Sequence, residues 1–262
     1  MRKTLFATAA LAALAFAGAA SAQSAIATGQ INVQPVQLSQ TNGLALLAVG
    51  GKLDVSTQAV GNNLSVETSD FSLSVGAQLN NQGFQLAETN VGFAGASEKI
   101  DINTAAVGNN ASIEVANAPG TTFAANLSGQ SNDIDLQVAR TNAGLILGGG
   151  DIEINTQAVG NALSLEATDF VGNLSGQFNL NGTQLAQTNL GLVGAADDID
   201  IGTTAVGNLA NLTGNGVIAG LLQTNFQGVQ IAQTNVVGVG SLAGNITVKT
   251  AAVGNSISVK LP

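Results

Sequence analysis

The sequence contains no histidine, cysteine, tryptophan or tyrosine, and its 262 residues include only 9 phenylalanines and 3 prolines. Without histidine and cysteine, the usual nucleophile and base pairs of enzymes are absent. Without cysteine, an exported chain cannot rely on disulfides for stability. Few aromatic rings favour a thin, regular core, because large rings usually fill wide and irregular interiors. We therefore expect a protein that is not an enzyme and has no catalytic residues, cofactor or metal.

Charged residues make up only 9% of the chain, and the formal net charge is −9. Residues 1–22 have the pattern of a secretory signal peptide: Arg2 and Lys3 precede a short apolar run that ends in Ala20-Ser21-Ala22, a small-residue cleavage site. Cleavage after Ala22 would remove both basic residues and change the net charge from −9 to −11. Such an acidic chain disfavours nucleic acids and anionic membrane surfaces as partners. We expect no helical membrane-spanning segment in the mature chain.

What the sequence does contain is repetition. The phrase Ala-Val-Gly-Asn occurs five times, at steps of 47, 52, 47 and 47 residues, beginning at Ala59, Ala106, Ala158, Ala205 and Ala252. The longer step contains the five extra residues 116–120, which include a Pro-Gly pair. Each phrase follows an alternation of aliphatic and polar residues such as Ile152-Glu153-Ile154. A fixed step and this alternation predict an array of short, half-buried strands.

The Gly-Asn pair of each phrase predicts a corner between two strands. Glycine permits a positive φ, and asparagine tolerates left-handed conformations or bonds to its own neighbouring backbone. The glycines of this set are Gly61, Gly108, Gly160, Gly207 and Gly254.

Asparagines at equivalent positions predict ladders, because stacked side-chain amides can hydrogen-bond along a pile of strands. We assign these ladders to stabilisation of the fold and to self-assembly. One ladder follows the repeated glycines: Asn62, Asn109, Asn161, Asn208 and Asn255. The other belongs to a recurring Thr-Asn pair: Asn42, Asn90, Asn142, Asn189 and Asn235.

These features predict an all-β fold, a β-solenoid (β-helix) of tandem units of about 47 residues. The predicted solenoid is a single domain over residues 36–262, and residues 23–35 form a leader or cap segment. Two coils per unit would give about ten rungs and a rod on the order of 50 Å long. Equivalent carboxylates such as Asp54 and Asp101 would then lie roughly 10 Å apart, where salt largely screens their repulsion. That spacing predicts a solvated acidic face that needs no cation.

Three stretches of the chain, Gln58-Ala-Val-Gly-Asn62, Ser175-Gly-Gln177-Phe-Asn179 and Gln187-Thr-Asn189, resemble the repeats of curli-type (curlin-like) functional amyloid subunits of bacterial surfaces. The chain also looks like the curli-related holdfast-attachment proteins of stalked bacteria. The similarity of style covers nearly all of the mature chain, although the curlin pattern Q-x-G-x-x-N separates the glycine and asparagine that are adjacent here. The resemblance implies secretion through a dedicated outer-membrane pore, self-assembly into fibres, and roles in adhesion and biofilm matrix.

Three functions remain open at this point. The first is a secreted structural protein at the bacterial cell surface, which assembles with itself into fibres and has a surface anchor as a further partner. The second is a monomeric surface adhesin, or glycan-binding solenoid, although glycan binding without aromatic stacking would be unusual. The third is an outer-membrane β-barrel, which the absence of tyrosine and tryptophan for interface girdles disfavours.

Overall fold

A computed structural model describes residues 25–48, 50–69, 73–116, 125–170, 173–195, 197–216, 221–241 and 244–260. The predicted signal peptide at residues 1–22 lies outside these ranges, so the structure does not test it. The described residues form ten strands: β1 (Ala25–Ala48), β2 (Leu53–Ser69), β3 (Leu73–Ala96), β4 (Lys99–Ala116), β5 (Ala125–Gly148), β6 (Asp151–Phe170), β7 (Asn173–Ala195), β8 (Ile199–Gly216), β9 (Leu221–Ser241) and β10 (Ile246–Lys260).

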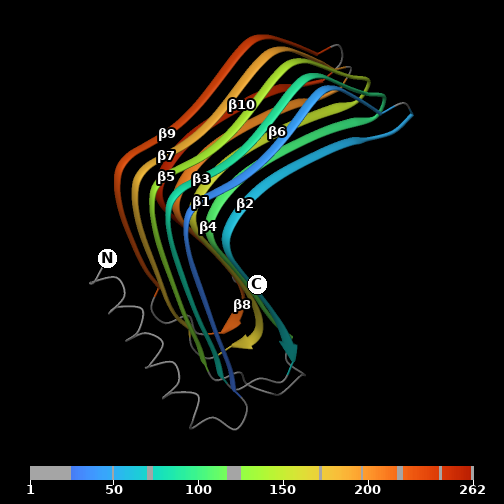
Figure 1. The fold of residues 1–262 in the computed structure, drawn as a ribbon. Helices are drawn as coiled ribbons and strands as arrows, with labels where there is room; N and C mark the ends of the chain where they lie inside the picture. Colours follow the sequence, from blue (N-terminus) through green and yellow to red (C-terminus); the bar gives the residue numbers. More distant parts are fainter. Residues whose placement is uncertain are drawn as a thin grey trace.

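The strands form two five-stranded parallel sheets, in the orders β1-β3-β5-β7-β9 and β10-β8-β6-β4-β2. The chain runs along one strand of the odd-numbered sheet, turns, and returns along a strand of the even-numbered sheet (Figure 1). Each repeat unit therefore adds one strand to each sheet and makes one complete coil. The fold is the predicted all-β solenoid. We call the two strands of one coil a rung.

The prediction of two coils per unit is wrong. Backbone pairing joins residues one repeat apart directly, as in Asn62 with Asn109 and Asn109 with Asn161. The second of these pairs spans the 52-residue step, so the longer repeat keeps the same register. The described residues form five rungs, and at about 4.8 Å per strand the stack is about 24 Å thick rather than 50 Å. The strands, at 15 to 24 residues, are correspondingly longer than the sequence suggests.

The first rung begins earlier than residue 36. Residues 25–35, which the sequence separates as a leader or cap segment, lie in β1 and pair with β3 from Ala25 with Leu73 onward. They carry members of the ladders described below, Gln30 and Asn32.

The predicted corner at each Gly-Asn pair is also wrong, because these residues lie inside the even-numbered strands. Backbone pairing between β2 and β4 skips Gly61 and resumes at Asn62, so the strand is interrupted by one position only. The long strands bend within their length instead of ending (Figure 1). Among the described glycines, a positive φ occurs only at Gly50, in the turn between β1 and β2, and at Gly214.

The core between the sheets is divided into zones along the strands. One end is packed with large aliphatic side chains around Ile100, Ile146 and Ile152. The other end is packed around Leu163 and Leu165. Between them lies a layer of alanines from both sheets: Ala59, Ala87, Ala106, Ala139, Ala158, Ala186 and Ala205. Because alanine is small, the sheets approach closely there, and polar side chains of one sheet can reach the backbone of the other.

Candidate functional site

The asparagines after the repeated glycines form the buried ladder that the sequence predicts. Asn109, Asn161 and Asn208 are fully buried, and each donates its side-chain amide to the side-chain oxygen of the next rung at 2.8 Å. Each also donates its second N–H across the core to a carbonyl of the odd-numbered sheet, as Asn161 does to Phe178 O. Both donors of the amide are therefore used, which a buried amide requires.

Three further ladders on the odd-numbered sheet face this one, and they were not predicted as ladders from the sequence. Gln30, Gln78, Gln130, Gln177 and Gln223 form the first. Asn32, Asn80, Asn132, Asn179 and Asn225 bond one another in series. Gln37, Gln85, Gln137, Gln184 and Gln230 do the same. The Gln85 amide also reaches the carbonyls of Ala59 and Val107 at 3.0 and 2.8 Å. The glutamine amides therefore bond from rung to rung and from sheet to sheet at once.

The repeated glycines make room for these amides. A Cβ at Gly160 would overlap the Asn179 side chain of the facing sheet and the carbonyl oxygen of Gly207 in the next rung. The same overlap would occur at Gly108 with Asn132. The glycine is thus required by close packing between the sheets, and not by the turn that its sequence context predicts.

A row of threonine hydroxyls runs through the core and was missed as a single feature. The threonine before each repeated phrase lies opposite the threonine of a Thr-Asn pair, and the two sets alternate from rung to rung. Nine hydrogen bonds of 2.7 to 2.8 Å connect ten hydroxyls in the order Thr41, Thr57, Thr89, Thr104, Thr141, Thr156, Thr188, Thr203, Thr234 and Thr250. Both sets recur at the same step in the sequence, and that is the signal that could have revealed the row.

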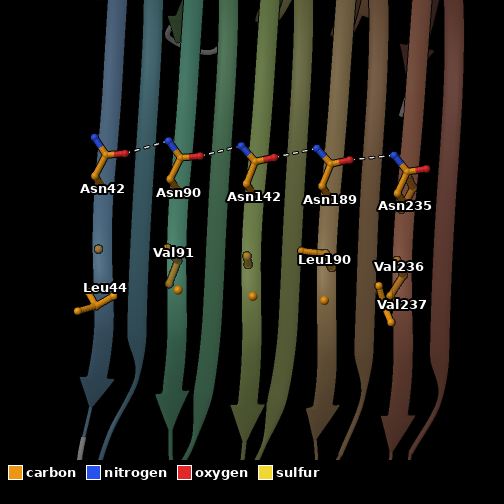
Figure 2. A pocket seen from close by; sticks show the side chains of 16 residues that line it. Asn42, Leu44, Asn90, Val91, Asn142, Asn189, Leu190, Asn235, Val236 and Val237 are labelled. Atoms are coloured by element: carbon orange, nitrogen blue, oxygen red, sulfur yellow. Dashed lines mark hydrogen bonds between the residues drawn. The ribbon is translucent and has the colours of Figure 1, made fainter.

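The second predicted ladder, from Asn42 to Asn235, lies on the outer face of the odd-numbered sheet. Figure 2 shows its five amides in one line, each hydrogen-bonded to the next at 2.7 to 2.9 Å. A shallow groove of about 1000 Å³ runs beside it. The floor includes Gly92, Gly144 and Gly191, where a Cβ would overlap a carbonyl of the adjacent rung.

The acidic residues also stack, at half the spacing that the sequence predicts. Asp101 pairs in register with Asp54 on one side and Glu153 on the other, so the carboxylates are one strand spacing, about 4.8 Å, apart. Lys99 lies between two of them, 2.9 Å from Glu153 and 3.5 Å from Asp101. Hydrogen bonding to Glu153 raises the pKa of Lys99, and hydrogen bonds from Lys99 and Asn155 lower the pKa of Glu153. Lysine and asparagine donors, rather than distance, offset the repulsion.

The two end rungs leave core side chains uncovered. Fifteen of the eighteen large apolar side chains exposed among the described residues lie in β1, β9 or β10. Ile246 and Val248 of β10 are each 48% exposed, whereas their partners in β8, Ile199 and Ile201, are buried. Both ends of each sheet are also edge strands with unpaired backbone groups on one side. Such edges are templates for another chain.

Within the described residues, no group of three or more acidic, histidine or cysteine side chains is placed to hold a metal ion. The same residues include no helix long and apolar enough to cross a membrane.

Comparison with models of known protein families gives a match over nearly the whole chain. The model of the family HfaD, described as holdfast attachment protein D, matches residues 2–259. No curated protein and no solved structure matches the chain.

Proposed function

The chain belongs to the HfaD family of holdfast attachment proteins, and from this premise we propose that it is a non-catalytic structural protein that assembles with itself into extracellular fibres. Membership of the family gives the protein a role in attachment at the cell surface. Self-assembly is the step that we add, and it rests on the two uncovered end rungs. In this function the protein acts through its shape and its contacts with other copies, and no reactive side chain is needed.

The observation that supports assembly is that the two end rungs carry the same ladder residues. A second copy placed on either end would meet side chains identical to those that its own interior rungs meet. The corresponding residues of the first and last rungs are Gln30 and Gln223, Asn32 and Asn225, Gln37 and Gln230, Thr41 and Thr234, Asn42 and Asn235, Thr57 and Thr250, and Asn62 and Asn255.

Electron microscopy of the purified chain tests this function. The protein should begin at Gln23, the product expected from signal-peptide cleavage. We expect fibres that grow with time and protein concentration, and loss of the monomer in sedimentation velocity. A chain that stays monomeric at high concentration, with no fibres and no cross-β diffraction, would contradict the proposal.

Export and anchoring follow as parts of the same proposal. The charged start, apolar run and small-residue cleavage site of residues 1–22 fit export by a signal peptide. A dedicated outer-membrane secretion pore and a surface anchor are the further partners that a cell-surface fibre needs. N-terminal sequencing of the protein released from cells should begin at Gln23, and retention of residues 1–22 would contradict this route.

The groove beside the outer asparagine ladder favours a second candidate, a monomeric adhesin that binds glycans. Asn90, Asn189 and Asn235 each donate one N–H to a neighbouring ladder amide and have a second N–H, and hydroxyl-rich ligands accept such bonds. The Asn142 amide also donates to Glu88. Retention on a glycan array by protein that forms no fibres would favour this candidate over assembly.

A further inference from the structure

The polar ladders have a direction, and the two end rungs are therefore complementary as well as similar. In the buried asparagine ladder every amide donates toward the C-terminal rung, from Asn62 to Asn109 and finally from Asn208 to Asn255. Asn255 then has a donor with no ladder acceptor above it, and Asn62 has an acceptor with no ladder donor below it. A second copy stacked in the same orientation supplies each with its partner.

The threonine row runs the opposite way and leads to the same conclusion. A hydroxyl has one proton, so Thr89, which donates to Thr57, must accept from Thr104. The same reasoning makes Thr250 donate to Thr234. Every proton then points toward the N-terminal rung, which leaves the Thr41 proton at one end and the Thr250 oxygen at the other. Two copies meeting by identical ends would oppose donor to donor or acceptor to acceptor.

Charge distinguishes the two ends further. No acidic residue follows Asp200, and the last strand carries Lys249 and Lys260, both exposed. The first rung carries Asp54 and Glu67 on β2. Opposite charge at the two ends favours the union of unlike ends.

The strand register shows where these charges would meet. Glu67, Glu114 and Glu166 stack in one column, which continues through Thr213 to Lys260. Adding one more rung to that column places Lys260 beside Glu67 of the next copy. Among the described residues Lys260 has no ion pair within its own chain.

Lys249, also in β10, is placed to form a second contact of this kind with the next copy. It is 3.7 Å from Asp200 of the preceding strand, in the acidic column that includes Asp54 and ends at Thr247. Asp54 of the next copy would flank Lys249 on its open side. Within the chain, Lys99 already joins two neighbouring carboxylates of this column. Lys52 of the next copy would stack on the neutral Asn245, so it opposes neither contact.

We infer that the C-terminal rung of one copy stacks on the N-terminal rung of a second copy in the register that continues the repeat, with Lys260 beside Glu67 and Lys249 beside Asp54. The inference rests on the proposed self-assembly and specifies its polarity and register. The contact joins unlike surfaces and continues the stack along its own axis, so each added copy leaves a free end and the product is an open fibre. It also covers the half-exposed Ile246 and Val248 of the last rung.

Charge exchange across the junction tests this arrangement. Lys260→Glu and Glu67→Lys each place like charges at every junction, so each variant alone should raise the critical concentration for assembly about fivefold or more at low ionic strength. An equimolar mixture of the two variants, and the double variant, should assemble like the wild type. In the mixture, residue 260 of one variant meets residue 67 of the other with opposite charge at every junction. Added salt should reduce the differences in critical concentration between the single variants and the wild type.

The matched control is Glu114→Lys, the same change in the same column but inside the stack. It should leave the critical concentration within about twofold of the wild type. Circular dichroism of each monomer shows whether the variants fold. If the wild type forms fibres while the single variants and their mixture behave as the wild type does, the register is wrong and the proposed function stands. If the wild type forms no fibres, both the register and the proposed self-assembly are wrong.

Discussion

The two predicted asparagine ladders, one buried and one on the outer face, place the same kind of side chain in two environments. Asn161 is fully buried and supplies both N–H groups and its oxygen to partners on three strands. Asn189 forms the same rung-to-rung bonds on the outer face, where it is half-buried and water can replace a lost partner. A buried group that loses its partner bears the full cost of desolvation, whereas an exposed group does not. The buried ladder should therefore account for stability and the outer ladder for surface properties.

Replacing one member of each ladder by alanine tests this difference. Asn161→Ala leaves the Asn109 amide, the Asn208 oxygen and the Phe178 carbonyl without their partner, and should lower the free energy of unfolding by about 3 kcal/mol or more. Asn189→Ala is the matched control and should cost less than about 1 kcal/mol. Chemical denaturation of both monomers measures the two values, and equal losses would contradict the assigned roles.

Asp133 is a carboxylate in a position where charge is unfavourable. Its own burial and the nearby Asp135 raise its pKa above the ordinary 3.8. The folded state therefore binds the proton more tightly than the unfolded state does. The resulting penalty is absent below the ordinary value and develops as the pH rises through the raised pKa. The residue paired with it in β3 is the neutral Asn81.

Asp133→Asn should accordingly stabilise the protein at neutral pH, and this gain in stability should shrink as the pH falls through the raised pKa toward 3.8. Glu153→Gln should instead destabilise the protein at neutral pH, and its effect should disappear at low pH. The pKa of Glu153 is lowered, so its ionised form stabilises the fold above the ordinary value of 4.5, and that contribution disappears as the pH falls through the folded pKa. Unfolding curves between pH 3 and pH 7 measure both trends. A difference between wild type and Asp133→Asn that does not change with pH would refute the account of Asp133.

At the scale of the strands, the sequence predicts repetition well and connectivity poorly. The constant step and the aligned asparagines predict a parallel stack, and Asn62 does pair with Asn109. The number of coils could not be read in the same way, because the Gly-Asn pair has the local chemistry of a turn. Its glycine is required by the facing Asn80, which lies on another sheet. The threonine row was not predicted for a similar reason: its alternate members come from opposite sheets, and the sequence does not show which positions of the two sheets face each other.

A glycine-to-alanine comparison separates close packing from turn formation. Gly160→Ala forces a methyl group against Asn179 and the Gly207 carbonyl, and should destabilise the fold by about 1 to 3 kcal/mol. The control is Gly176→Ala near the start of β7, where a Cβ meets nothing within 4 Å and the paired residue of β9 is Leu222. That change should be neutral or slightly stabilising, because glycine weakens a strand. Thermal melting of both variants decides the matter; a stable Gly160→Ala protein would argue against sheet contact as the reason for glycine.

At the scale of the whole molecule, the protein is a short section of a pattern that could continue indefinitely. Its five rungs share the same polar ladders, and the ladders end at two faces that differ in hydrogen-bond direction and in charge. The interior of the stack satisfies its buried amides by repeating itself, and the ends lack only one more rung. Under the proposed self-assembly, a holdfast attachment protein built in this way would lengthen by adding copies without a change of fold.

The axial rise per subunit in assembled fibres, measured by electron cryo-microscopy, tests the central claim most directly. Five rungs stacked without a gap predict a rise of about 24 Å per subunit, with strands about 4.8 Å apart throughout and no break at the junction. The strand spacing alone is shared by any cross-β fibre, so the subunit rise is the decisive value. Fibres in which each chain advances by a single strand spacing, or in which subunits meet by identical ends, would contradict the account.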